Sequence, residues 1–223
     1  LVPLPALNQP MMLSMPPEKD FPLIDLRYSV LFACLDIKTV VTIVLGLLAL
    51  ERKVIVMTTR PSLVLDVCEL LRSLLFPFEL CAPYVPRLTE PFKSSLDFPG
   101  AIFVGIHDDS EPNGLASMVK SAYPEDSIVV DLDTGNIDCG GDRFEALTGI
   151  WDILPHSSRS SLVHELETLC RDAKIVDGQE PLDSLNDSAF FVDLPGAVDG
   201  CDVSMQSREP LDDRAVRDAF LRF

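Results

Sequence analysis

The sequence predicts an α/β fold in which a mainly parallel central sheet is flanked by helices. Four short apolar segments have the composition of strands, and helical segments alternate with them along the chain. One of those helices is apolar on every side, which is typical of a helix buried inside a core. Strands that alternate with helices favour a parallel sheet covered on both faces. The chain has 223 residues, of which 47 % are hydrophobic, so a sizeable core is expected.

The all-apolar helix is expected over residues 37–50, directly before Glu51. Asp36 is suited to cap its first turn, because an aspartate side chain accepts hydrogen bonds from the first backbone N–H groups. A helix that crosses a bilayer needs about 20 apolar residues. The apolar run extends back only to Lys38, which makes it too short for a spanning helix. We therefore expect it in a protein core.

A strand and a second helix follow. Residues 54–58 are rich in β-branched side chains, which favour a strand. Pro61 and Ser62 then open a helix that continues to residue 75 with apolar residues at helical spacing. This stretch therefore predicts helix, strand and helix in succession.

The same alternation continues further along the chain, with proline, glycine and acidic residues at the ends of the segments. In order, the sequence predicts a short strand within residues 78–86 that ends at Pro86, a helix or turn over residues 86–100, a strand over residues 101–106, a short helix over residues 115–126, a strand over residues 127–133 and a turn over residues 134–137.

The C-terminal third has a different character. Residues 155–174 predict an amphipathic helix that begins in a run of serines. Residues 176–213 hold ten acidic residues and one basic residue, Arg208, which indicates a flexible acidic loop. Residues 210–223 predict a helix with one apolar face. The sequence leaves open whether the packing partner of that face lies beyond the end of the chain.

The net charge of the chain is −17 and its pI is about 4.4. Nucleic acids and anionic lipids bind proteins through lysine and arginine. A chain this acidic is therefore expected to bind neither of them directly. An acidic surface suits a partner with a basic patch, although it also simply favours solubility.

The cysteines have neither the spacing of a zinc finger nor a C-x-x-C pair. Three of them, Cys34, Cys68 and Cys81, stand in apolar stretches, where a thiol is commonly a small buried hydrophobic group. We therefore expect a reduced, cytosolic compartment. The sequence predicts no catalytic side chain, no cofactor site and no metal site.

Two aspartates nevertheless permit an enzymatic interpretation. Asp131 and Asp133 stand two residues apart just after an apolar strand, which is how a Mg²⁺-dependent phosphatase of the haloacid-dehalogenase type presents its nucleophile and its general acid. Lys174 is the candidate for the downstream lysine of that family, while Thr134 and Gly135 stand in the reverse of its usual order. The alternative is a turn at the end of a strand, which aspartate and glycine favour.

Four motifs follow one another within residues 37–138: LLALERKVIVMTTRPSLV (residues 47–64), LLRSLLFPFELCAPYVPRL (residues 70–88), SLDFPGAIFVGIHDD (residues 95–109) and IVVDLDTGNI (residues 128–137). Taken as one string, residues 37–138 resemble the central module of DENN domains (cDENN). The final AVRDAFLRF resembles the opening of the downstream helical module (dDENN), and Thr89 departs from the family, which often has a proline there.

The resemblance implies part of a guanine-nucleotide exchange factor for a Rab GTPase. Such a regulator stabilises the nucleotide-free GTPase and needs no catalytic side chain. Its implied partners are a Rab GTPase and an upstream longin-like lobe of the same parent protein. It would be cytoplasmic and recruited peripherally to vesicle or endosomal membranes, reaching the membrane through the GTPase. The phosphatase and a DENN-like scaffold without exchange activity remain the alternatives.

The predicted organisation has four parts. Residues 1–20 are a Pro/Met-rich lead-in linker, and residues 21–175 a cDENN-like α/β domain. Residues 176–210 are the acidic flexible loop, and residues 211–223 begin a truncated dDENN-like helical module.

Partners of open α/β sheets favour the loops after the carboxyl ends of the strands. This rule places the partner-binding site of this chain in the loops after four predicted strands. The candidate residues are Arg60, Pro61, Arg87, His107, Asp108, Asp109, Asp133 and Thr134.

Overall fold

The computed structural model describes residues 26–112, 114–122, 124, 126–139, 149–151, 153–175 and 211–223. The predicted linker and acidic loop lie outside these residues. In chain order the elements are α1 (Tyr28–Cys34), α2 (Ile37–Leu48), β1 (Lys53–Thr58), α3 (Pro61–Ser73), β2 (Tyr84–Leu88), the 3₁₀ helix η1 (Glu90–Asp97), β3 (Phe103–His107), α4 (Leu115–Ser121), β4 (Ser127–Asp131), β5 (Asn136–Cys139), α6 (His156–Asp172) and α7 (Asp213–Arg222).

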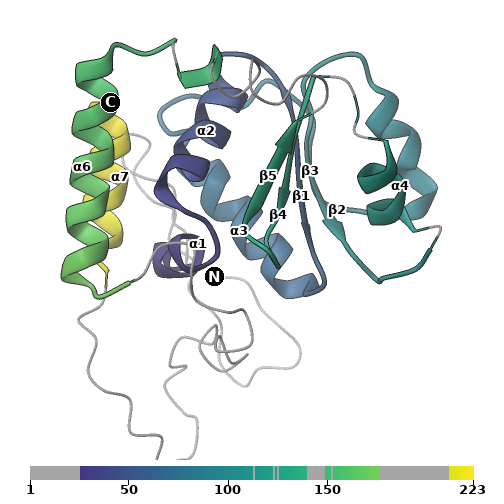
Figure 1. Cartoon of the computed structure of the whole chain (residues 1–223). Coiled ribbons are helices and arrows are strands. Elements are labelled where there is room, and N and C mark those ends of the chain that lie inside the picture. The colour runs from purple at the N-terminus through teal and green to yellow at the C-terminus, as the bar shows by residue number, and fades with distance from the viewer. Residues whose placement is uncertain are drawn as a thin grey trace, which may run out of the picture.

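The centre of the fold is a five-stranded sheet in the order β2-β3-β1-β4-β5 (Figure 1). Strand β1 lies in the middle, where Val54 is paired with Phe103 of β3 on one side and Ile128 of β4 on the other. All neighbouring strands are parallel except β4 and β5, which form an antiparallel pair. The predicted α/β class with a mainly parallel sheet is therefore confirmed.

Two strand predictions need correction. Residues 134–137 were expected to form only a turn, but β5 begins at Asn136 and pairs with β4. Its sequence, NIDC, lacks an apolar run because β5 is an edge strand and is not buried between neighbours. The second strand does not end at Pro86 but continues through it, from Tyr84 to Leu88. A proline is tolerated there because β2 is also an edge strand, where a missing N–H need not break the ladder.

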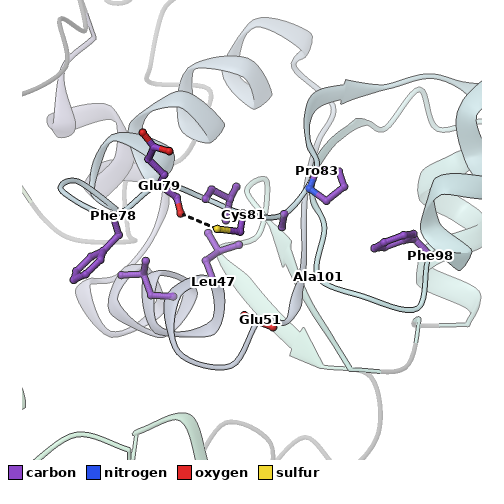
Figure 2. A pocket seen from close by; sticks show the side chains of 11 residues that line it. Leu47, Glu51, Phe78, Glu79, Cys81, Pro83, Phe98 and Ala101 are labelled. Atoms are coloured by element: carbon purple, nitrogen blue, oxygen red, sulfur yellow. Dashed lines mark hydrogen bonds between the residues drawn. The ribbon is translucent and has the colours of Figure 1, made fainter. Parts of the chain in front are cut away.

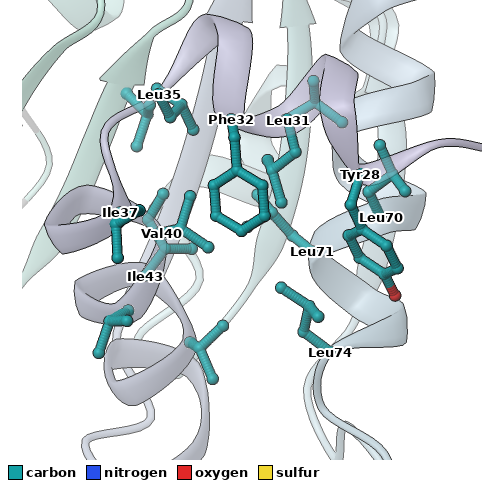
Figure 3. Close-up of a cluster of buried hydrophobic side chains, with 14 of the residues drawn as sticks. Tyr28, Leu31, Phe32, Leu35, Ile37, Val40, Ile43, Leu70, Leu71 and Leu74 are labelled. Atoms are coloured by element: carbon teal, nitrogen blue, oxygen red, sulfur yellow. The ribbon is translucent and has the colours of Figure 1, made fainter. Parts of the chain in front are cut away.

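Helix α2 agrees with its prediction. The Asp36 side chain accepts a hydrogen bond from the Thr39 backbone N–H at 2.6 Å, which caps the first turn. Residues 39–47 are all buried, and the exposed residues of the helix are Lys38 in its first turn and Leu48 at its end. The side chains of α2 pack with those of α1 and α3 in the cluster shown in Figure 3.

In the part of the chain that the structure describes, no single helix is both long and apolar enough to span a membrane. Helices α1 and α2 reach the required length and composition only as a pair, and a bend of 107° separates them.

The core has two layers, one on each face of the sheet. Alternate residues of β1 point to opposite faces: Val54 and Val56 join the cluster under α1, α2 and α3, while Ile55 and Met57 join the cluster with η1 and α4. Burying each such side chain contributes about 1.5–3 kcal/mol to the free energy of unfolding. The prediction that helices cover both faces is confirmed.

The C-terminal helix α7 packs inside the chain. It lies beside α6 and also contacts α1, so its apolar face packs against other described parts of the chain (Figure 1). Polar contacts fix it: Asp213 accepts a hydrogen bond from the Tyr28 backbone N–H at 2.9 Å, and Arg217 donates one to the Tyr28 hydroxyl at 3.1 Å. The same hydroxyl lies 2.5 Å from the Ser73 hydroxyl on α3.

The expectation that three cysteines are buried is correct for two of them. Cys34 and Cys68 lie in the core, and burial raises the pKa of both thiols. Cys81 is exposed, because the residues between α3 and β2 form a surface segment in place of the predicted strand start.

Candidate partner-binding site at the carboxyl edge of the sheet

Three loops meet where the parallel strands end. Because β3, β1 and β4 are adjacent and parallel, the segments that follow them emerge at the same edge of the sheet. We call residues 59–61, 107–109 and 132–134 the carboxyl-edge loops, although His107, which was expected in a loop, is the last residue of β3, and Pro61 is the first residue of α3. They contain every candidate site residue except Arg87.

Asp133 joins the loop after β4 to the end of β1. Its carboxylate accepts hydrogen bonds from the Thr58 hydroxyl at 2.7 Å and from the Thr59 backbone N–H at 2.8 Å. The backbone adds a third link, from the Leu132 N–H to the Met57 carbonyl at 2.9 Å. Hydrogen bonds to a charged acceptor are stronger than neutral ones, so this carboxylate holds the two loops in a fixed arrangement.

His107 and Asp108 join the loop after β3 to the same strand end. The Asp108 backbone N–H donates to the Thr58 carbonyl at 2.8 Å. His107 Nε2 lies 3.1 Å from the Thr59 carbonyl, and since a carbonyl only accepts, Nε2 must carry the proton. Thr58 and Thr59, at the end of β1, therefore bind both neighbouring loops.

Lys120 of α4 adds an ionic link. Its ammonium lies 2.7 Å from Asp108 Oδ2 and 3.6 Å from Asp131 Oδ2. The hydrogen bond from Lys120 lowers the pKa of Asp108, and the same bond raises the pKa of Lys120. Both groups are therefore charged over a wide pH range, and the ends of β3 and β4 share one cation.

Arg60 and Pro61 lead from β1 into α3. Pro61 is the first residue of α3, where a missing N–H leaves no hydrogen bond unmade. The Arg60 N–H donates to the Thr58 hydroxyl at 3.1 Å, and its side chain is half-buried. Burial raises the pKa of the Cys34 thiol to about 12, and the nearby charge of Arg60 acts in the opposite direction.

The other candidates differ in exposure and position. Asp109 and Thr134 are exposed at the surface of the loops. Asp109 accepts a hydrogen bond from the Glu111 N–H at 3.1 Å, which keeps its loop compact. Arg87, by contrast, lies inside strand β2 and not in a loop after it, because that strand continues to Leu88. The prediction that Arg87 belongs to the loop cluster is wrong.

The two aspartates of the phosphatase hypothesis form a strand-end turn. Asp131 Oδ1 accepts hydrogen bonds from the backbone N–H groups of Asp133 at 3.0 Å and Thr134 at 3.4 Å. The described residues contain no group of three or more His, Cys, Asp or Glu that could hold a metal ion. Lys174 follows α6, which packs on α2 and α7. The geometry is thus that of the turn interpretation.

Sequence reasoning missed Lys120 and Thr58 as parts of this site. Thr58 looks like an ordinary strand residue, and Lys120 like a polar residue on a short surface helix. Their roles depend on the strand order, which sets β3 and β4 on either side of β1. One signal was present in the sequence: two predicted strands end in aspartates, at residues 108–109 and 131–133, and clustered carboxylates are stabilised by a nearby cation.

Comparison with known proteins agrees with this architecture. Residues 4–135, more than half of the chain, match the DENN (AEX-3) domain. The chain is also similar to the DENN domain and WD repeat-containing protein SCD1 of Arabidopsis thaliana, with 29 % identity over 122 residues, or 55 % of this chain. The matched stretch spans 10 % of the length of that relative. The motifs, the mainly parallel sheet and the match over residues 4–135 lead to one assignment: the chain belongs to the DENN domain family.

Proposed function

We propose that this chain is part of a guanine-nucleotide exchange factor for a Rab GTPase and that its carboxyl-edge loops contact the GTPase. The observation that carries the proposal is the set of hydrogen bonds that fixes three loops to the end of β1. Membership in the DENN family supports it, since DENN domains generally bind Rab GTPases.

The proposed activity is differential binding. A regulator that binds the loaded and nucleotide-free states equally well shifts nothing, however tightly it binds. One that binds the nucleotide-free state more tightly weakens nucleotide binding by the same factor, because the two equilibria are linked. No nucleophile or general base is required. A pre-formed binding surface at the carboxyl edge is therefore sufficient for nucleotide exchange by this mechanism.

Two properties of the loops suit this task. They are held in place before a partner arrives, so little conformational entropy is lost on binding. Their surface is also acidic: Asp109 and Asp133 are exposed, as is Glu111 just after the second loop. When a GTPase loses its nucleotide phosphates and Mg²⁺, the basic groups that held the phosphates lose their partners. An acidic loop surface favours that state electrostatically.

The proposal extends to the surroundings of the chain. An upstream longin-like lobe of the same parent protein would supply the second half of the GTPase-binding surface. The protein would be cytoplasmic and recruited peripherally to vesicle or endosomal membranes by the GTPase. Nucleic acid is not among the proposed partners, because the net charge of −17 opposes it.

The test is release of a fluorescent GDP analogue from a panel of Rab proteins, with the parent protein and with this chain alone. The parent should accelerate release from at least one Rab. The chain alone should act poorly, because it supplies one lobe. Binding without acceleration by the parent would identify a scaffold and would contradict exchange. Equal rates for chain and parent would contradict the two-lobe argument.

A further inference from the structure

A groove lies at the opposite edge of the sheet from the carboxyl-edge loops. Its lining includes Glu51, Pro83 and Ala101, which precede β1, β2 and β3 respectively. Because these three strands are parallel, the groove is at their amino ends, and we call it the amino-edge groove. Its volume is about 430 Å³, enough for several side chains of a ligand.

The groove is lined by apolar side chains that remain accessible. Phe78 is 66 % exposed, Phe98 is 45 % exposed and Leu48 is 36 % exposed. Figure 2 shows Phe78 and Phe98 at opposite ends of the lining, with Leu47 and Cys81 between them. Large aromatic side chains contribute strongly to binding when a partner covers them. Exposed apolar side chains that line a hollow offer a partner both shape and apolar surface to cover.

The charged residues of the lining are both acidic, Glu51 and Glu79. Among the described residues, neither carboxylate has an ion-pair partner. The cations next in sequence are engaged elsewhere: Arg52 pairs with Asp126 at 2.5 Å, and Lys53 donates to the Leu96 carbonyl at 3.2 Å. The groove therefore combines an apolar lining with negative charge that the described residues do not neutralise.

We propose that the amino-edge groove binds a short peptide segment of another polypeptide, with apolar side chains in the groove and flanking lysine or arginine residues against Glu51 and Glu79. Such a segment complements both the shape and the charge of the site.

Charge disfavours the other occupants. A second copy of this chain would bring another net charge of −17 to the groove. Residues 1–25 of the chain are apolar enough, but they carry three acidic residues and one basic residue. An anionic lipid surface would be repelled by the two glutamates. A basic peptide of a different protein is the occupant that the charges favour.

Cys81 provides a reporter inside the groove. Its thiol is exposed and lies 3.8 Å from the Glu79 carbonyl oxygen. The other described cysteines, Cys34, Cys68, Cys139 and Cys170, are buried. Cys201 lies outside the described residues, so Cys201→Ser removes the competing thiol. The rate of Cys81 alkylation by iodoacetamide then reports whether the groove is covered.

The experiment selects binders from a displayed library of random peptides on the Cys201→Ser chain. The probes are the selected peptides, made synthetically. We expect enrichment of two or more large apolar residues next to lysine or arginine. Saturating peptide should slow Cys81 alkylation at least tenfold. Failure to select binders, or binders that leave the alkylation rate unchanged, would overturn the proposal.

Matched variants assign the binding to the groove. Phe78→Ser should weaken the affinity at least tenfold, whereas Phe92→Ser should change it less than twofold. Phe92 is the control because it is 64 % exposed but does not line the groove. Glu79→Lys should shift the selection toward acidic flanks. Equal loss with Phe92→Ser, or unchanged flanks with Glu79→Lys, would contradict the proposal. So would protection of Cys81 that grows with chain concentration in the absence of peptide, which would indicate a second copy.

Discussion

Asp133 and Thr58 connect the ends of two adjacent parallel strands: the hydroxyl of Thr58, the last residue of β1, donates to Asp133 Oδ1 at 2.7 Å. The same carboxylate accepts the Thr59 N–H, so one side chain fixes the backbone of a neighbouring loop. These contacts hold the carboxyl edge in place in the absence of a partner.

Removal of this carboxylate tests that relationship. We expect Asp133→Ala to lower the free energy of unfolding by about 1–2 kcal/mol, because hydrogen bonds to a charged group are lost. Urea denaturation measures the change. Asp97→Ala is the control, since Asp97 is exposed and its carboxylate has no hydrogen-bond partner among the described residues. If both variants unfold alike, Asp133 does not hold the loops together.

The position of β1 predicts the effect of a buried charge. Val54 is completely buried between β3 and β4. Val54→Asp should destabilise the fold by about 3 kcal/mol or more, because an unpaired carboxylate would be buried. Leu65→Asp on α3 is the control, because Leu65 is 44 % exposed and should change stability by less than about 0.5 kcal/mol. A Val54→Asp protein with the wild-type urea midpoint would contradict the central placement of β1.

The ion pair between Asp108 and Lys120 predicts a pH dependence. The pKa of Asp108 lies below its usual value of 3.8, so the pair stabilises the fold above that pH, and this stability is lost as pH falls through the lowered pKa. The pKa of Lys120 lies above its usual 10.5, so the contribution is also lost as pH rises through that raised pKa. Lys120 is 41 % exposed, so solvent screening limits the effect to about 0–1 kcal/mol.

Lys120→Met should therefore reduce stability near pH 7 and leave it unchanged at the acidic limit. Titration of the Asp108 carboxyl by NMR gives the sharper readout: its pKa should rise in Lys120→Met. Lys93→Met serves as the control, because Lys93 is exposed and has no ion-pair partner among the described residues. An Asp108 pKa that does not change in Lys120→Met would show that the pair does not form in solution.

How far the sequence predicts the fold depends on how strongly a segment is buried. Helix α2 and its Asp36 cap were predicted correctly, because an all-apolar helix is stable only when it is buried in a core. Strand β5 was missed, because an edge strand with polar side chains carries no hydrophobic period. The sequence predicted a strand end at Pro86 because proline has no N–H to donate to a ladder, and only the sheet order shows that β2 is an edge strand, where a proline is tolerated.

The site was predictable in outline and not in its contacts. The rule that partners approach the carboxyl ends of strands selected residues from three loops. The structure places these three loops next to one another, at the same edge of the sheet. It did not reveal that Lys120 bridges two of them or that Thr58 is bonded on both sides. Those contacts depend on long-range strand order, which local sequence does not encode. Arg87 was misplaced because the end of β2 was misplaced.

The docking of α7 is the next testable feature. Tyr28 is fully buried, and its hydroxyl links Arg217 of α7 to Ser73 of α3. Tyr28→Phe should cost about 1–2 kcal/mol, given the typical net value of each lost hydrogen bond, and should speed amide exchange in α7. Tyr84→Phe is the matched control, because it removes a hydroxyl bonded to Glu69 and should leave exchange in α7 unchanged. Equal exchange in α7 for wild type and Tyr28→Phe would contradict this link.

The most direct test of the proposed function is the rate of GDP release from a responsive Rab by the parent protein carrying Asp109→Lys and Thr134→Arg. Both residues are exposed on the carboxyl-edge loops, and each substitution removes only one exposed hydrogen bond to a backbone N–H, so the fold should persist while the surface changes charge and shape. Asp97→Lys, an exposed charge reversal on η1, is the control. We predict at least a tenfold loss of release activity for the double variant and less than a twofold change for the control. Wild-type release by the double variant would contradict the claim that the carboxyl edge contacts the GTPase.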